Sequence, residues 1–226
     1  MQGSLQSLPT PGKKIKVGAR INGKEEDSSY CVIAHCDSHR SSVTATDNAT
    51  KQSSSYYFDW AFDARVKTQE LYEATCRPLI DAFFAGFNAT YLAYGQSGSG
   101  KTHTLDGVIH LALQDIFERR AQRTAEGATV CVKLTYIEVY QEKCFDLLAE
   151  VARAHLKLTD VRSVEVDSVQ QVMGYITQGG LRRTKGSTSM NTTSSRSHAI
   201  CTISLRVSGG GAGVTAKLHL VDLAGS

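Results

Sequence analysis

The sequence predicts an α/β protein with a largely parallel central sheet flanked by helices. Runs of β-branched and apolar residues alternate along the chain with segments whose apolar residues recur every three or four positions. A glycine-rich stretch at 95–102 follows one of the apolar runs and precedes one of the helical segments. The 226 residues suffice for one sizeable domain with a hydrophobic core, or at most for two small ones.

Strands and polar segments make up the predicted N-terminal part. Residues 1–13 are polar and are expected to form a disordered tail. Short strands are expected at 14–21 and 29–36, and alternating aromatic and polar residues predict a half-buried strand at 56–63. The segment 37–55 is rich in Ser, Thr and Asn and lacks apolar periodicity, which predicts a solvated loop.

Helical periodicity begins at Thr68 and continues to Gly86, where a C-terminal stop is expected. Pro78 conflicts with an unbroken helix, so it should either kink the helix or mark its true start. The short apolar run at 89–95 is typical of a buried parallel strand, and a helix is expected at 101–120.

The remaining chain is expected to add three strands and one helix. The β-branched run at 129–140 predicts a long strand that ends in a turn. A helix weakened by its glycines is expected at 168–183. Two further strands, at 198–208 and 214–223, are separated by a glycine-rich turn.

Composition argues against several classes of protein. The net charge of +3 is mild and no basic run stands out, so neither nucleic acid nor a membrane is expected as a partner. No apolar stretch approaches the roughly 18 residues of a membrane span, and the N-terminus lacks the apolar region of a secretory signal. The six cysteines, at positions 31, 36, 76, 131, 144 and 201, lack metal-binding spacing and are expected to be reduced thiols of a cytosolic protein.

The glycine-rich stretch matches the pattern G-x-x-x-x-G-K-[ST]. Its residues are Gly95, Gln96, Ser97, Gly98, Ser99, Gly100, Lys101 and Thr102. Glycines let successive backbone N–H groups point at phosphate oxygens, and the following helix N-terminus favours an anion. Lys101 would neutralise the β- and γ-phosphates, and the Thr102 hydroxyl would bind Mg²⁺. The alternative is a Gly/Ser turn that ends in Lys-Thr by chance, but the flanking strand and helix favour the phosphate loop.

Two further motifs lie towards the end of the chain. Asp222 closes an apolar strand and is followed by Leu-Ala-Gly, where it could hold a magnesium-bound water while the Gly225 N–H reaches the γ-phosphate. The alternative is a strand that ends in an Asp turn. Residues 191–198, NTTSSRSH, gather hydroxyls, an arginine and a histidine before a strand, although a helix cap or a polar loop has the same composition.

Together the three motifs resemble those of the kinesin motor domain family. The family patterns G-Q-[TS]-G-S-G-K-T, N-x-x-S-S-R-S-H and D-L-A-G-S-E correspond here to GQSGSGKT, NTTSSRSH and DLAGS, in the same order. The flanking segments TQELYEATCRPLIDAFFAGFNATYLAYG and YIEVYQEKCFDLL also resemble the family. The resemblance covers 14–226 and implies a P-loop NTPase fold, here an incomplete motor domain that holds its nucleotide-binding half.

The resemblance implies ATP and Mg²⁺ as ligands. The eight residues of the phosphate loop would bind the ATP phosphates, with Thr102, Ser195 and Asp222 on the Mg²⁺ side. His103 corresponds to a position where the family often stacks a side chain on adenine. Arg20 is the remaining match to the family's adenine-side motif R-x-R-P.

The resemblance also implies a set of residues that act in ATP hydrolysis. These residues are Ser194, Ser195, Arg196, Asp222 and Gly225. The two serines correspond to switch hydroxyls near Mg²⁺ and the attacking water. Arg196 corresponds to an arginine that pairs with a glutamate of the second switch.

The chain departs from the family pattern at three places. Asn22 and Gly23 replace the second Arg and the Pro of R-x-R-P, which should weaken contact with adenine. The family's loop near the nucleotide is missing after the phosphate loop, where THTLDGVIHLALQDIF runs almost straight through. The sequence stops at Ser226, before the expected glutamate and the main tubulin-binding segment. An exposed sheet edge and low stability are therefore expected for the isolated chain.

Two functions are compatible with these observations. The first is a kinesin-type ATPase motor domain that moves along microtubules, in the cytoplasm and on the cytoskeleton, of which this chain is a part. The alternative is a naturally truncated, non-motile protein that binds nucleotide or a partner. A generic P-loop enzyme ranks third, because no substrate-binding acid or lid is found. The chain itself is expected to bind nucleotide weakly and to show little microtubule-stimulated hydrolysis.

Overall fold

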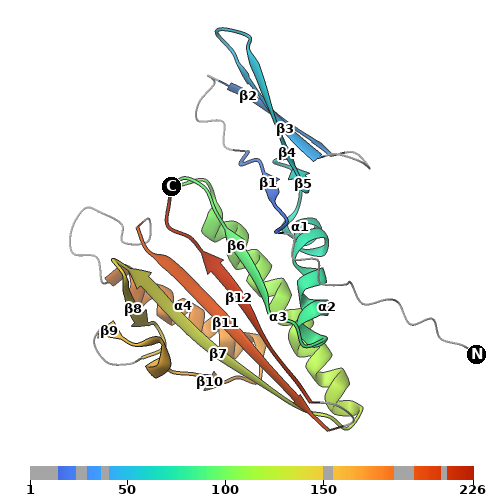
Figure 1. Cartoon of the computed structure of the whole chain (residues 1–226), viewed down its shortest axis with the longest axis vertical. Coiled ribbons are helices and arrows are strands. Elements are labelled where there is room, and N and C mark those ends of the chain that lie inside the picture. The colour runs from blue at the N-terminus through green and yellow to red at the C-terminus, as the bar shows by residue number, and fades with distance from the viewer. Residues whose placement is uncertain (1–14, 24–29, 37–40, 150–154, 186–195, 210–212) are drawn as a thin grey trace, which may run out of the picture. The chain divides into compact units, whose positions relative to one another are not determined.

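The computed structural model describes residues 15–23, 30–36, 41–149, 155–185, 196–209 and 213–226 (Figure 1). The chain divides into two compact units, Met1–Val66 and Lys67–Ser226, which are described here one after the other. The tail predicted at 1–13 lies outside the described residues. The single partial motor domain expected from residue 14 onwards stays a prediction.

The smaller unit consists of two short sheets. In the first, β1 (Gly18–Arg20) pairs in parallel with β5 (Trp60–Phe62). In the second, β2 (Tyr30–Cys36), β3 (Ser41–Asp47) and β4 (Ser53–Phe58) form an antiparallel meander. The strands predicted at 14–21, 29–36 and 56–63 are therefore present, although the last divides between β4 and β5.

The solvated loop predicted at 37–55 is wrong, because most of that segment forms β3 and β4. Hydroxyl groups pair across the two strands, with 2.8 Å between the Thr44 and Ser55 oxygens and 2.9 Å between those of Thr46 and Ser53. β-branched Thr fits a pleated sheet, and cross-strand Thr–Ser pairs add to its stability. A search for apolar periodicity misses such strands.

Helices of the larger unit begin and end close to the predicted positions. They are α1 (Thr68–Thr75), α2 (Arg77–Phe84), α3 (Lys101–Ala125) and α4 (Val169–Lys185). Pro78 lies in the first turn of α2, so it marks the start of a second helix, one of the two outcomes expected. Gly86 adopts a φ of +95° just beyond α2, as a helix stop requires.

One sheet organises the larger unit. Its strands are β6 (Ala89–Ala93), β7 (Thr129–Tyr140), β8 (Lys143–Asp146), β9 (His155–Leu156), β10 (Val164–Glu165), β11 (His198–Ser208) and β12 (Val214–Asp222). Their order is β6-β12-β11-β7-β8-β9, with β10 also paired to β7. β6 pairs only with β12 among the described strands, so it lies at an edge of the sheet.

The α/β class is confirmed, but the expectation of a largely parallel sheet is wrong. Among the described strands of this sheet, only β6 and β12 pair in parallel, and the other pairs are antiparallel. Short connections explain two of these pairs, because β7 turns into β8 through two residues and β11 into β12 through five. Connections of this length allow only hairpins, whereas parallel strands need a long crossover.

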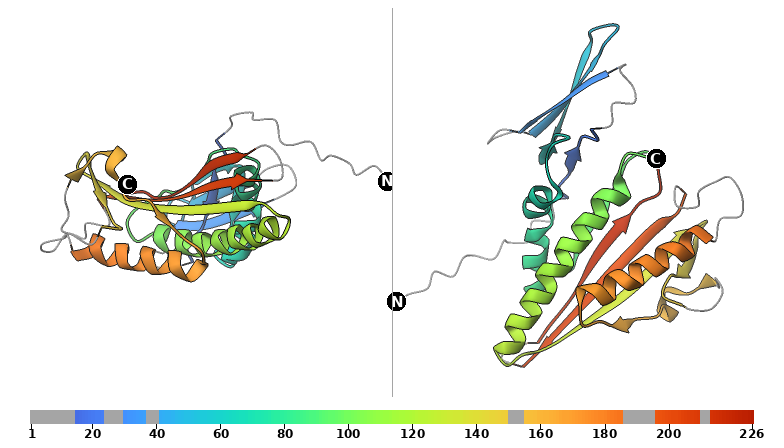
Figure 2. Two further views of the ribbon diagram at one scale, coloured as in Figure 1. Left: turned by 90° about the horizontal axis from the view of Figure 1, so that it is seen from below. Right: turned by 180° about the vertical axis from the view of Figure 1, so that it is seen from behind.

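The hydrophobic core lies between the sheet and its helices. Figure 2 shows α3 and α4 along one face of the sheet, and α1 and α2 also pack against α3. The buried positions of α3 recur every three or four residues and are Leu105, Val108, Ile109, Ala112, Leu113 and Ile116. No helix within the described residues is long and apolar enough to cross a membrane.

Candidate nucleotide-binding site

The predicted phosphate loop connects the end of β6 to the start of α3. Gly98 and Gly100 adopt φ values of +81° and +91°, which other residues rarely tolerate. Gly100 is the N-terminal cap of α3, and as a glycine it has no side chain to cap the first N–H groups of this helix. The start of a 25-residue helix thus presents uncapped donors and a positive dipole end at the loop, which suits an anion.

Lys101 curls back over the loop. Its Nζ donates to the backbone oxygens of Gly95 and Gln96, at 2.7 Å and 2.9 Å. The ammonium group is therefore held beside the loop by weak neutral acceptors. A phosphate oxygen carries a full charge and would attract the same group more strongly.

Sheet pairing brings the second motif to the loop. The parallel register of β12 and β6 aligns Asp222 with Ala93, two residues before the loop. The Thr102 hydroxyl donates to Oδ2 of Asp222 at 2.9 Å. The motif residues Thr102 and Asp222, 120 positions apart in the sequence, thus meet at one point.

The residues after β12 run along the same loop. The Leu223 N–H donates to the Ala93 oxygen at 3.2 Å, and the Ser226 N–H to the Gly95 oxygen at 3.4 Å. The Ala224 N–H donates to Nδ1 of His198 at 3.0 Å. Gly225 lies between these anchored residues, next to the phosphate loop.

Asp222 has a free acceptor that suits a hydrated cation. Its side chain is buried, and its Oδ1 has no hydrogen-bond partner among the described residues. A buried carboxylate oxygen without a donor is costly unless a ligand supplies one. Together with the hydroxyl of Thr102, it forms an oxygen donor set of the kind that Mg²⁺ and its waters prefer.

A buried arginine, which the sequence analysis missed, completes the site. Nη1 of Arg183, on α4, donates to Oδ2 of Asp222 at 3.2 Å. Nη2 donates to the Ser197 oxygen at 2.7 Å, and Nε lies 3.8 Å from Oε1 of Glu138 on β7. The guanidinium therefore links α4, β7 and β12 to the residue just before β11.

Sequence signals for this cluster did exist. On β7, the charged Glu138 continues a series of alternate buried positions that includes Leu134 and Tyr136. On α4, Arg183 continues the buried positions Val172 and Gly179 at helical spacing. A charged residue on an otherwise buried face usually has a charged partner. This rule could have identified Glu138 and Arg183 from the sequence.

Asp106 is a second residue that the sequence analysis missed. It lies one helical turn after Thr102 on α3. Loss of surrounding water, and then the nearby Asp222 carboxylate, raise the pKa of Asp106, while His103 acts in the opposite direction. Two carboxylates that repel each other beside the loop add negative charge, which a bound cation would relieve.

The other predicted residues are less completely placed. Ser194 and Ser195 lie outside the described residues, so their expected roles stay predictions. Arg196 is exposed and forms no ion pair within the described parts of the chain, and His103 is also exposed. Arg20 belongs to the smaller unit, where its guanidinium donates to the Val66 oxygen at 3.2 Å.

Comparison with known proteins identifies the family. The kinesin motor domain family model matches residues 19–226. The chain is 37% identical over 207 aligned residues to kinesin-like protein KIN-4C of Arabidopsis thaliana, covering 70% of this chain and 16% of that protein. It is 34% identical over 252 aligned positions to mouse kinesin-like protein KIF3C, covering 98% of this chain and 31% of that protein.

A solved structure agrees with these sequence matches. The motor domain of kinesin-like protein Kar3 from Saccharomyces cerevisiae superposes with a TM-score of 0.80 at 28% identity. The match covers 94% of this chain and 72% of the Kar3 chain. The chain spans less than a third of the length of each of the two curated relatives. Because the family model matches most of its residues, the chain belongs to the kinesin motor domain family.

Proposed function

We propose that this chain is the nucleotide-binding part of a kinesin-type motor, which binds Mg-ATP and hydrolyses it to drive movement along microtubules. The observation that carries the proposal is the junction of the phosphate loop, the N-terminus of α3 and Asp222. Family membership supports the motor activity, the microtubule as partner, and a location on the cytoskeleton in the cytoplasm. The non-motile alternative gains no support from any contact in the described residues.

The chain supplies the positive groups that a triphosphate needs. The backbone N–H groups of the loop and of the first turn of α3 would bind phosphate oxygens, and Lys101 would leave its carbonyl acceptors for the β- and γ-phosphates. Such a preorganised site stabilises charge without reorganising at the moment of reaction. Binding and orientation are therefore the main contributions expected of the phosphate loop.

The metal side of the site has its own residues. Thr102 and Asp222 fit a hydrated Mg²⁺, and Ser195 is proposed to join them from the first switch. When bound, Mg²⁺ supplies positive charge to the β- and γ-phosphate oxygens. Gly225 is proposed to offer its N–H to the γ-phosphate, and Ser194 and Arg196 to orient the attacking water. His103 and Arg20 are proposed as contacts on the adenine side.

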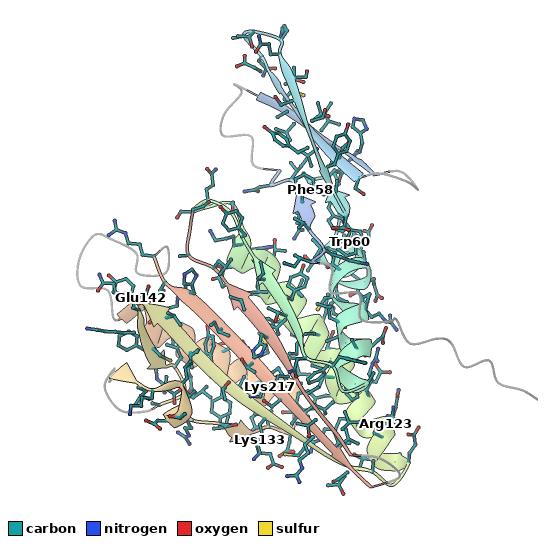
Figure 3. All side chains as sticks on the ribbon, in the orientation of Figure 1. Phe58, Trp60, Arg123, Lys133, Glu142 and Lys217 are labelled. Atoms are coloured by element: carbon teal, nitrogen blue, oxygen red, sulfur yellow. The ribbon has the colours of Figure 1, made fainter. Side chains whose placement is uncertain are left out.

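Equilibrium binding of a fluorescent Mg-ATP analogue tests the nucleotide site. Replacing Lys101 with alanine should weaken binding at least about tenfold, because hydrogen bonds to charged groups contribute about 1.5–3 kcal/mol each. Lys133→Ala is the matched control, since Lys133 is exposed on β7 away from the loop (Figure 3). Equal affinities of the unaltered chain and Lys101→Ala would contradict the proposal.

Phosphate release tests the motor activity. Release that rises with microtubule concentration, and that is lost in Lys101→Ala, would support the motor activity and would overturn the expectation of little stimulation in this chain. Nucleotide binding without any microtubule stimulation would restrict the proposed function to the nucleotide site.

A further inference from the structure

Glu138 is a carboxylate buried in the middle of the core. Its relative exposure is 0%, and it lies on the face of β7 that Leu134 and Tyr136 also line. Burying a charge in an apolar environment costs several kcal/mol unless a partner compensates it. A glutamine or leucine would avoid that cost, so the residue needs an explanation beyond packing.

Arg183 stands between Glu138 and the candidate site. Its side chain is 7% exposed and its guanidinium presents donors in a rigid plane. Nη1 points to Asp222 and Nη2 to the Ser197 oxygen, while Nε donates to Oγ of Ser197 at 3.2 Å. Glu138 lies on this Nε side, with 3.8 Å between Nε and its Oε1, so its charge would act on the guanidinium from the side opposite to Asp222.

The cluster has an unequal balance of charge. Two carboxylates, Glu138 and Asp222, share one guanidinium in a region from which water is largely excluded. Arg183 therefore cannot neutralise Asp222 completely. The Asp222 carboxylate keeps negative charge, and its Oδ1 has no hydrogen-bond partner in the described parts of the chain.

We propose that Glu138 is a positioning residue, which holds the Arg183 guanidinium so that Asp222 stays available to a metal-bearing nucleotide. The inference rests on the proposed Mg-nucleotide site and deepens it. Without the Glu138 charge, Arg183 would pair more tightly with Asp222, and Asp222 would bind the metal less well. The expected change is thus in the contribution of Mg²⁺ to nucleotide affinity, rather than in phosphate binding by the loop.

The test compares nucleotide affinity in excess Mg²⁺ with affinity in excess EDTA. A fluorescent ATP analogue is titrated into the unaltered chain and into Glu138→Gln, Glu138→Asp and the control Glu142→Gln. Glu142 lies in the exposed turn between β7 and β8 (Figure 3). The ratio of the two dissociation constants measures the Mg²⁺ contribution, and a melting curve of each variant reports folding.

Glu138→Gln should lower the Mg²⁺ contribution by about 10-fold or more, as the loss of supporting residues around a metal typically does. Glu138→Asp keeps the charge and should lower the contribution less, and Glu142→Gln should match the unaltered chain. A purely structural role of Glu138 would instead weaken binding equally with and without Mg²⁺. In an Arg183→Met background, Glu138→Gln should have no further effect on the ratio.

The outcomes separate the two proposals. If the unaltered chain binds no nucleotide in either condition, the proposed function fails and this inference fails with it. If the unaltered chain binds but Glu138→Gln keeps the same Mg²⁺ contribution, only the inference is overturned. If Glu138→Gln does not fold, Glu138→Asp decides, and an unchanged ratio in that variant counts against a positioning role.

Discussion

Two regions of the larger unit bury side chains against the same sheet by different means. Where α2 and α3 pack on β6 and β12, the buried residues are apolar and include Ile80, Phe83 and Leu113, all with 0% exposure. Where α4 crosses β7, the buried residues include the charged Glu138 and Arg183. The stability of the first region depends on side chains that fill its volume. The stability of the second depends on charged groups held at particular positions.

Removal of Arg183 should have the largest effect on stability. Arg183→Met leaves the carboxylates of Glu138 and Asp222 buried without their shared cation, which should cost about 3–5 kcal/mol. Urea unfolding measures the loss, and Arg123→Met, at an exposed position near the end of α3 (Figure 3), should stay within about 0.5 kcal/mol. A cost as small as that of the control would show that the charged cluster adds no stability.

Truncation in the apolar region should cost nearly as much, but a conservative exchange should not. Leu113→Ala should cost about 2–5 kcal/mol because it leaves a cavity, whereas Leu113→Met nearly conserves volume and should cost less than about 1.5 kcal/mol. Arg183→Lys conserves the charge, as Leu113→Met conserves the volume. It nevertheless loses the planar guanidinium that reaches Asp222 and Ser197, and it should therefore cost more stability than Leu113→Met. The comparison would fail if Arg183→Lys were tolerated as well as Leu113→Met in the same unfolding assay.

The second region also depends on a glycine, at the point where α4 packs against β7. A Cβ at Gly179, on α4, would lie 2.6 Å from ring atoms of Tyr136 on β7, but a Cβ at Gly180 would meet nothing within 4 Å. Gly179→Ala should therefore cost about 1–3 kcal/mol, through overpacking that moves α4 and with it Arg183. Gly180→Ala should instead stabilise the helix by roughly 0.5–1 kcal/mol. Thermal melting of the two variants checks the opposite signs.

The same contrast explains what could be predicted from sequence. The strand at 198–208 was predicted with its observed bounds, since burial on one face produces a pattern that is local in sequence. β3 and the first residues of β4 were missed because Ser and Thr hydroxyls pair there, Thr44 with Ser55 and Thr46 with Ser53, and give no apolar periodicity. The antiparallel pairing was missed because periodicity indicates strands but not their neighbours.

The candidate site divides in a similar way. The phosphate loop and Asp222 were found because each belongs to a short motif of contiguous residues. Glu138 and Arg183 were missed because each is a single charged residue whose partner lies far along the chain. Their meaning depends on a contact that only the folded sheet creates.

The smallest effect is expected on β12, at the face opposite to its core positions. His219, on β12, faces away from the core positions Leu218 and Leu220, and its Nδ1 lies 2.9 Å from the Thr202 hydroxyl. Burial, and then the neighbouring Lys217, lower the pKa of His219 below the ordinary value of 6.5. The unfolded chain therefore takes up a proton first as the pH falls.

It follows that His219 contributes stability that is fully present above pH 6.5 and is lost as the pH falls through its lowered folded pKa. His219→Asn removes the titrating group, so the loss of stability between pH 7 and pH 5 should become smaller. Lys217→Met removes the second cause and should reduce the same loss by a smaller amount. Urea unfolding at several pH values measures both changes. If His219→Asn instead lost more stability than the unaltered chain between pH 7 and pH 5, protonation of His219 would stabilise the fold. The half-buried charge would then be compensated here, as the buried charge of Arg183 is.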